Sequence, residues 1–174
     1  MLMSRNSKTK RICFMGLLFA VAVVLSYVEG MIVIPGLPPG VKLGLSNIVT
    51  MYCVFFLGTT NAYTLAVLKA LSVLLMRGPT GALLSLLGGV VSVTVMLLLL
   101  HLRKQKLSYL VISILGAIGH NMGQLLGASM LTGTTLTLYY FPILILSGIM
   151  MGFVTGLVLK TVLPAVEKLD QRLR

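Results

Sequence analysis

Acidic side chains are almost missing from this sequence of 174 residues. Only Glu29, Glu167 and Asp170 are present, and no Asp or Glu lies between residues 30 and 166. Most of the chain therefore offers no carboxylate for acid–base or metal chemistry, and we find no catalytic machinery in it. We predict that the protein is not an enzyme and that it has no metal site and no cofactor.

Charged residues of either sign are also scarce. They make up 10% of the chain, against 57% hydrophobic residues and a mean hydropathy of +1.05. Soluble domains are about one quarter charged, so this composition indicates an integral membrane protein. The net charge of +11 comes from basic clusters beside apolar runs. Membrane topology and anionic lipid account for such clusters, and nucleic acid is not an expected partner.

The two cysteines, Cys13 and Cys53, suggest packing residues rather than a functional pair. Both lie inside apolar segments, and they form no CxxC motif. Neither a metal site nor a disulfide framework is indicated by this spacing.

Apolar runs long enough to cross a bilayer, which needs about 20 residues or about 17 at the short end, divide the chain into segments. We place six transmembrane helices near residues 12–30, 44–58, 62–77, 82–101, 108–130 and 138–160. The predicted organisation is a basic cytoplasmic N-terminus (1–11), a transmembrane domain (12–160) and a cytoplasmic tail (161–174). The first helix is expected to stay uncleaved, because no small-residue cleavage site follows it.

The distribution of basic residues supports six crossings of the inner membrane. With both termini in the cytoplasm, eleven of the fourteen Lys and Arg residues face inward, as the positive-inside rule favours. Only Lys42 and Arg77 then lie outside, and Lys69 falls within the third span. Merging the second and third spans across residues 58–61 would leave five, with one basic cluster on the wrong side.

The segment 31–43 is rich in proline and glycine but remains apolar. It contains Pro35, Pro38 and Pro39, which the interior of a helix or strand does not tolerate. A simple connector and a half-inserted external flap both fit this composition. The apolar character favours packing onto the bundle, and whether the segment gates a cavity stays open.

Small residues recur at four-residue intervals along several spans, which is typical of helices that pack closely in lipid. The stripes are Gly119, Gly123 and Gly127, then Gly148, Gly152 and Gly156, and a weaker one of Gly81, Ser85 and Gly89. They predict that spans four to six form a compact bundle. In the first span, Gly16 and Ala20 form a smooth ridge with Cys13 and Val24, which would face either another helix of this chain or a partner protein.

Three ionisable residues fall within the predicted spans, where each costs a few kcal/mol on insertion scales. Glu29 ends the first span, and we expect an ordinary interfacial carboxylate there. Lys69 lies near the middle of a short span and cannot easily reach the interface, so a polar cavity is expected beside it. His120 lies in the fifth span.

His120, Asn121 and Gln124 form the densest polar group in the chain. His120 and Gln124 share a helix face at a spacing of four residues, and Asn121 is three residues from Gln124. Such groups either bind a ligand or tie helices together, and the sequence leaves both open.

Our candidate substrate-binding residues combine this group with polar residues of the second and third spans. They are Asn47, Lys69, His120, Asn121 and Gln124. Other polar residues could complete a cavity open to the outside: Lys42, Ser46, Ser72, Tyr139 and Tyr140. The two tyrosines also suit an interfacial aromatic belt. Basic groups without a carboxylate favour an anionic or acceptor-rich ligand.

Four blocks of this sequence are distinctive: residues 39–48, 69–72, 84–89 and 116–124, of which the last contains the HNxGQ motif. They resemble a family of bacterial membrane proteins known both as heptaprenyl diphosphate synthase component I and as Gx transporter. The resemblance extends from about residue 12 to about residue 160.

The two family names imply different functions. Prenyl diphosphate synthases of the usual kind bind Mg²⁺ and diphosphate through aspartate-rich motifs, because Mg²⁺ requires hard oxygen ligands. With Asp170 as its one aspartate, this chain could be at most a non-catalytic membrane accessory subunit of heptaprenyl diphosphate or isoprenoid synthesis.

The architecture is more similar to the S components of energy-coupling factor (ECF) transporters, which are six-helix membrane proteins that capture vitamins and metals. This resemblance implies that Gly16 and Ala20 face a transmembrane partner, since S components present an AxxxA face there. No GxxxxGK[ST] motif is present, so ATP use would require separate ATPase subunits. We therefore expect an all-α, S-component-like bundle that binds a small solute for uptake. The accessory subunit is the alternative, and a scaffold without a ligand is a third possibility.

Overall fold

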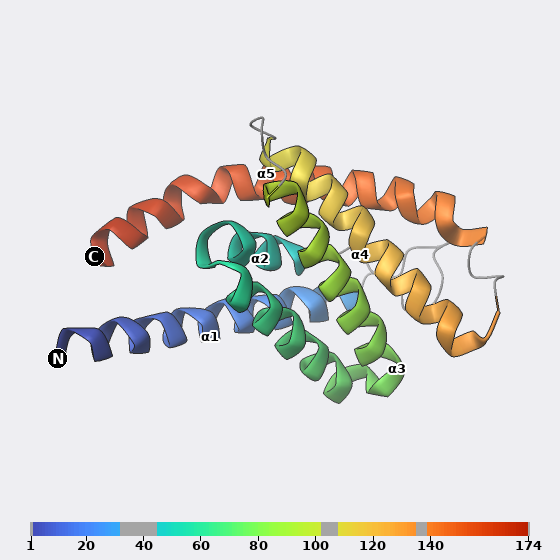
Figure 1. Ribbon diagram of the computed structural model, residues 1–174, viewed down its shortest axis with the longest axis horizontal. Helices are drawn as coiled ribbons and strands as arrows, with labels where there is room; N and C mark the ends of the chain where they lie inside the picture. The colour runs from blue at the N-terminus through green and yellow to red at the C-terminus, as the bar shows by residue number, and fades with distance from the viewer. Residues whose placement is uncertain (1, 32–44, 102–107, 135–138, 174) are drawn as a thin grey trace.

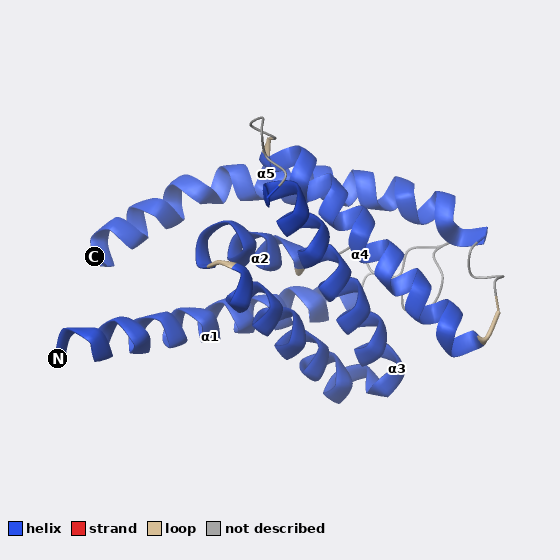
Figure 2. Cartoon of the chain, viewed as in Figure 1, coloured by secondary structure: helices blue, strands red, loops and turns tan. Residues whose placement is uncertain are grey.

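The computed structural model of the protein describes residues 2–31, 45–101, 108–134 and 139–173, and nearly all of these residues are helical (Figures 1 and 2). Side chains are described at residue 9 and in 11–31, 45–101, 108–134 and 139–161. The elements are α1 (Leu2–Met31), α2 (Asn47–Tyr52), a π-helical turn η1 (Cys53–Leu57), α3 (Thr59–His101), α4 (Tyr109–Thr132) and α5 (Phe141–Leu173). The predicted all-α class is confirmed.

Four of these helices are long and apolar enough to cross a membrane, with α3 counted as one. However, α3 is interrupted at Gly78, whose φ of 76° and ψ of −174° are non-helical. A positive φ favours glycine, and Pro79 suits the first turn of a new helix because it lacks an N–H group. Thus α3 is built from two helices, 59–77 and 79–101, where the sequence predicted a third and a fourth span.

The two halves of α3 fold back on each other as an antiparallel pair. A Cβ atom placed on Gly81 would lie 3.3 Å from Val73, and one placed on Gly89 would lie 3.2 Å from the Cβ atom of Ala66. The weaker small-residue stripe therefore serves the contact within α3.

The boundary near residues 58–61 is a true break. Gly58 has φ 84° and ψ 172°, so η1 and α3 do not form one continuous helix. The carbonyl oxygen of Leu57, at the end of η1, accepts hydrogen bonds from Arg11 at 3.2 Å and Asn61 at 2.6 Å. The helical segment formed by α2 and η1 covers residues 47–57, which is about 16 Å at 1.5 Å per residue and shorter than the predicted span 44–58. Most of the proline-rich segment 31–43, including Lys42, lies outside the described residues.

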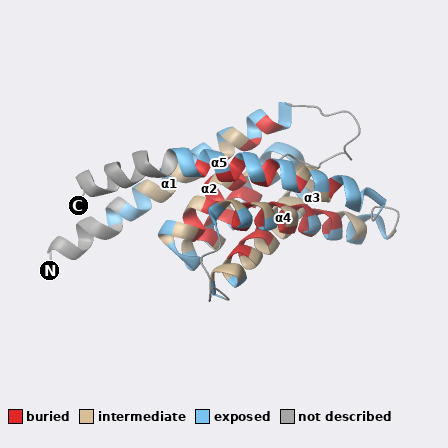
Figure 3. Ribbon diagram, turned by 90° about the horizontal axis from the view of Figure 1, so that it is seen from above, coloured by how far each residue is buried: buried red, intermediate tan, exposed pale blue. Residues whose placement is uncertain are grey.

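Helix α4 is the most enclosed element. In its most apolar window 61% of the residues are buried, against 17% in that of α1. Figure 3 shows the resulting band of buried residues along α4. On one face, a Cβ atom at Gly123 would lie 2.6 Å from the carbonyl oxygen of Leu87 in α3.

The other face of α4 receives the glycine stripe of α5. Gly148, Gly152 and Gly156 pack in turn against Ile118, Ile114 and Leu110. Each glycine lies directly over the backbone of α4, so the two helices approach more closely than side chains would permit. The compact packing predicted for spans four to six is confirmed.

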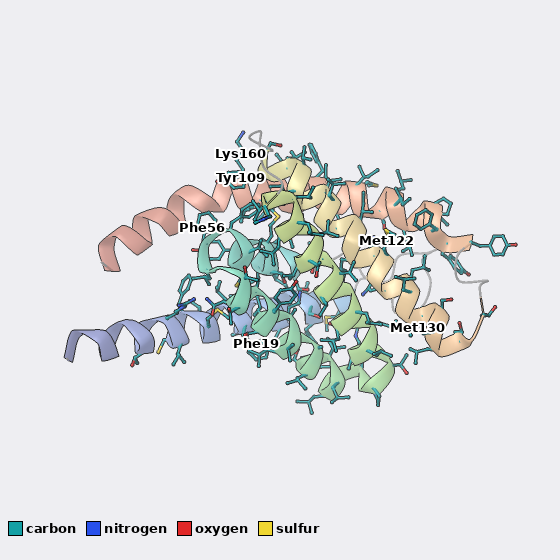
Figure 4. The ribbon with its side chains drawn as sticks, in the orientation of Figure 1. Phe19, Phe56, Tyr109, Met122, Met130 and Lys160 are labelled. Carbon is teal, nitrogen blue, oxygen red and sulfur yellow. The ribbon has the colours of Figure 1, made fainter. Side chains whose placement is uncertain are left out.

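Both ends of the chain lie at the same end of the molecule (Figure 1). Tyr109 and Lys160 lie near each other toward that end, and Met130 lies at the opposite end of α4 (Figure 4). The ring of Tyr109 packs edge-on against Phe55 with 4.9 Å between ring centroids. At the opposite end, the guanidinium of Arg77 lies against Gly30 and joins the end of α1 to the bend of α3.

We expect Gly152→Ala to lower the stability of the purified protein, because its Cβ atom would overlap the backbone of Ile114 and lie 3.0 Å from the carbonyl oxygen of Ser113. Overpacking of this kind costs about 1–3 kcal/mol. The matched control is Gly16→Ala, since no atom lies within 4 Å of a Cβ atom there. Thermal unfolding in detergent measures both variants, and equal midpoints would contradict the packing described here.

Candidate functional site

Lys69 lies inside the bundle on the first half of α3, with 5% of its surface exposed. Its Nζ atom donates to three oxygens at the start of α2: the carbonyl of Ser46 at 3.3 Å, Oδ1 of Asn47 at 3.3 Å and Oγ1 of Thr50 at 3.1 Å. The sequence predicted a polar cavity beside this lysine, and the structure places three oxygens there that are bonded to it directly. Asn47 and Lys69, two of the predicted site residues, are in direct contact.

The ammonium group of lysine has three N–H donors, and the start of α2 provides three acceptors. All three acceptors are neutral oxygens on one short segment, so Lys69 attaches the beginning of α2 to the first half of α3. Without this cation, two buried side-chain oxygens, on Asn47 and Thr50, would lose a donor, and buried polar groups without a partner are costly.

His120 and Gln124 form a second buried group, on α4. They are 6% and 5% exposed, and both lie against Gly88 in the second half of α3. A Cβ atom at Gly88 would lie 2.8 Å from Cε1 of His120 and 2.9 Å from Cγ of Gln124. Glycine at position 88 is therefore needed for these two side chains to occupy their places.

The amide oxygen of Gln124 differs from the other polar atoms of this group. It is fully buried and accepts no hydrogen bond within the described part of the chain. Nearly all buried polar atoms in proteins have a partner, so this oxygen calls for a functional explanation.

Asn121 points away from this group toward α5. Its Nδ2 atom donates to the carbonyl oxygen of Leu144 at 2.8 Å and to Oγ of Ser147 at 3.1 Å. The sequence left open whether the three polar residues of α4 bind a ligand or tie helices together. For Asn121 the structure places the amide in a contact between helices, on a different side of α4 from His120 and Gln124.

The lysine group and the α4 group lie on two sides of the second half of α3. Gly88 contacts His120 and Gln124, while the next residue, Gly89, contacts Ala66, one turn before Lys69. Two adjacent glycines thus separate the two groups. The structure brings the predicted site residues together as two pairs, Asn47 with Lys69 and His120 with Gln124.

Two residues with notable environments were missed or misjudged from the sequence. Thr50 is 1% exposed and bonds to Lys69, but a single threonine in an apolar run gives no signal beyond its three-residue spacing from Asn47. Glu29 is 3% exposed, so the expectation of a solvated interfacial carboxylate is wrong. Tyr139 and Tyr140, in contrast, are exposed, as an aromatic belt requires.

The ridge on α1 is open. Cys13, Gly16, Ala20 and Val24 are all exposed, and nothing in the described chain lies within 4 Å of a Cβ atom at Gly16. Of the two alternatives for this ridge, contact with another described helix of this chain is excluded.

Comparison with protein families gives a match over residues 18–162, which include both buried polar groups, to the family described as heptaprenyl diphosphate synthase component I. The chain belongs to this family. The match covers the HNxGQ block and most of the helical bundle, as the resemblance of the sequence blocks led us to expect. A search of curated proteins finds no match to this chain.

Comparison with solved structures finds a similar fold. The matching structure is described as the S component of a bacterial ECF transporter. It aligns with a TM-score of 0.58 and 23% sequence identity, and the alignment covers 96% of the present chain and 99% of the S component. At this identity the similarity concerns the fold, which is that of a multi-pass, S-component-like membrane protein.

We predict that Lys69→Met destabilises this component I family member, because the start of α2 loses the donor shared by Ser46, Asn47 and Thr50. Breaking buried polar contacts of this kind costs about 1–3 kcal/mol. Circular dichroism during heating is a suitable measurement. Thr50→Val, which removes one of the three acceptors, should have a smaller effect, and a Lys69→Met protein as stable as wild type would show that α2 does not depend on the lysine.

Proposed function

We propose that this protein is a non-enzymatic substrate-binding protein of the S-component type, which captures a small solute for uptake across the inner membrane. The observation that carries the proposal is the pair of buried polar groups beside Gly88 and Gly89, inside a mostly apolar bundle. Ionisable and amide groups are costly within a membrane, and where they persist they commonly mark a substrate pathway. The S-component fold supports the same function.

The proposed topology has six crossings with both termini in the cytoplasm. The halves of α3, 59–77 and 79–101, are about 28 Å and 34 Å long, so each can span a hydrocarbon core of about 30 Å. The segment α2–η1 reaches only about half of that thickness. The placement of both chain ends at one end of the molecule supports an even number of crossings.

The proposed binding residues are Asn47, Lys69, His120, Asn121 and Gln124, with different roles. Lys69 has its N–H donors directed at α2, so it acts on a solute through its charge more than through direct contact. A buried cation favours an anionic or acceptor-rich solute over a cationic one. Asn121 contributes by fixing α4 against α5, while His120 and Gln124 lie on the side of α4 that faces α3.

Transport by such a protein requires partners, and we assign their contact to the ridge of Gly16 and Ala20. ECF-type transmembrane and ATPase subunits are the proposed partners. The ridge is exposed and has small residues four apart, which permits close approach of another helix.

The description of the family favours a second candidate function. As a member of a family described as heptaprenyl diphosphate synthase component I, the protein would be a membrane accessory subunit of isoprenoid synthesis. The scarcity of carboxylates still argues against catalysis by this chain itself.

Native mass spectrometry of the protein, purified in mild detergent from its own host, tests the uptake function. We expect a bound small solute, and we expect it to be lost in His120→Ala because that change removes a buried group beside Gly88. Co-purification of a soluble prenyl synthase subunit with no bound solute would overturn the uptake proposal in favour of the accessory subunit.

The partner contact is tested by Gly16→Leu combined with Ala20→Leu. We expect this double variant to keep its thermal stability, since both positions are exposed, and to lose co-purifying transmembrane and ATPase subunits. The control is Val67→Ile, a small change at an exposed apolar position of α3, which should retain them. Equal recovery of partners with both proteins would exclude the ridge as the docking face.

A further inference from the structure

The unpaired amide of Gln124 carries information about the chemistry of the solute. Its Oε1 atom is fully buried and accepts no hydrogen bond within the described residues, and the residue is 5% exposed. By contrast, the amide of Asn121 three positions earlier is bonded twice to α5. Two amides on one helix thus have different environments: that of Asn121 is hydrogen-bonded to α5, and the oxygen of Gln124 accepts no hydrogen bond within the described residues.

Leaving a buried acceptor without a donor lowers stability, so a purely structural role would be better served by an apolar side chain. The position is also tightly defined. A Cβ atom placed on Gly88 would lie only 2.9 Å from Cγ of Gln124. On the same face of α4, Gly123 contacts the backbone of Leu87 and Gly88. The arrangement places an amide oxygen that has no donor among the described residues beside Gly88, which has no side chain.

A primary carboxamide presents an acceptor and a donor side by side. Its complement is another cis-amide edge, an N–H next to a C=O, as found in lactams, cyclic imides and nucleobases. If the amide is rotated by about 180° so that its oxygen and nitrogen exchange places, a solute that is flipped over can still form both hydrogen bonds. The complementarity therefore holds for either orientation of the amide. A carboxylate or phosphate lacks the donor and would leave Oε1 unpaired.

We infer that the solute presents a cis-amide edge to Gln124, which forms two hydrogen bonds with it beside Gly88. This inference rests on the proposed uptake function and names the chemical class of its substrate. Glutamine has several rotatable side-chain bonds, so its amide can meet a solute without movement of α4. Sites built to hydrogen-bond a substrate N–H reject analogues that lack it, since their own buried groups are then left unpaired.

The first experiment needs no ligand. In protein shown by mass spectrometry to be free of solute, Gln124→Met removes the unpaired amide at similar volume, and its midpoint of thermal unfolding should rise by about 2–4 °C. The matched variant Asn121→Leu removes an amide that is bonded to Leu144 and Ser147, and its midpoint should fall. A fall for Gln124→Met as well would show that this amide is a packing element and would overturn the inference.

The second experiment uses named probes in the same unfolding assay. The probes are 2-pyrrolidone, succinimide, uracil and hypoxanthine, each with its N-methylated counterpart. At least one parent compound should raise the midpoint of the wild-type protein and of Gly16→Ala, while its N-methylated form and the Gln124→Met protein show no shift. No shift with any probe, equal shifts with N-methylated forms, or a retained shift in Gln124→Met would each overturn the inference.

Failure of this inference differs from failure of the uptake function. A solute that co-purifies from the native host but has no N–H next to a C=O would overturn the inference and leave uptake standing. Absence of any solute from that preparation would count against the uptake function itself.

Discussion

Direct contact between the backbone of α4 and those of its neighbours is the constraint on which the rest of this structure depends. In lipid there is little hydrophobic drive to bring helices together, and close packing at small residues takes its place. Gly123 brings α4 against the carbonyl of Leu87, and Gly152 brings α5 against Ile114. Because both contacts involve backbone atoms, the three helices have almost no freedom to slide along one another.

This close packing also determines where the polar residues of α4 can go. With α3 on one side and α5 on the other, neighbouring residues of the HNxGQ block face different helices. Asn121 meets acceptors on α5, whereas His120 and Gln124 lie over Gly88, where only a glycine leaves them room. A single short motif therefore combines a structural bond with a candidate binding surface.

Much of the fold could be predicted from the sequence because hydrophobicity, charge and glycine spacing act locally. These signals predict the helical class and the division of the 59–101 stretch near Gly78. They also predict the close packing of spans four to six. Other features could not be predicted. The burial of Glu29 depends on which helices cover the end of α1, and the role of Thr50 depends on a lysine nineteen residues away.

By itself, then, the sequence determined that this chain is a helical membrane protein without carboxylate clusters and with a few polar residues in its spans. Only the tertiary structure decided what each of those residues contacts. It paired Lys69 with Asn47, directed Asn121 to α5 and left the Gln124 oxygen without a donor among the described residues. The reason is physical: periodicity places a side chain on a face of its own helix, but the neighbour opposite that face is set by how all the helices pack.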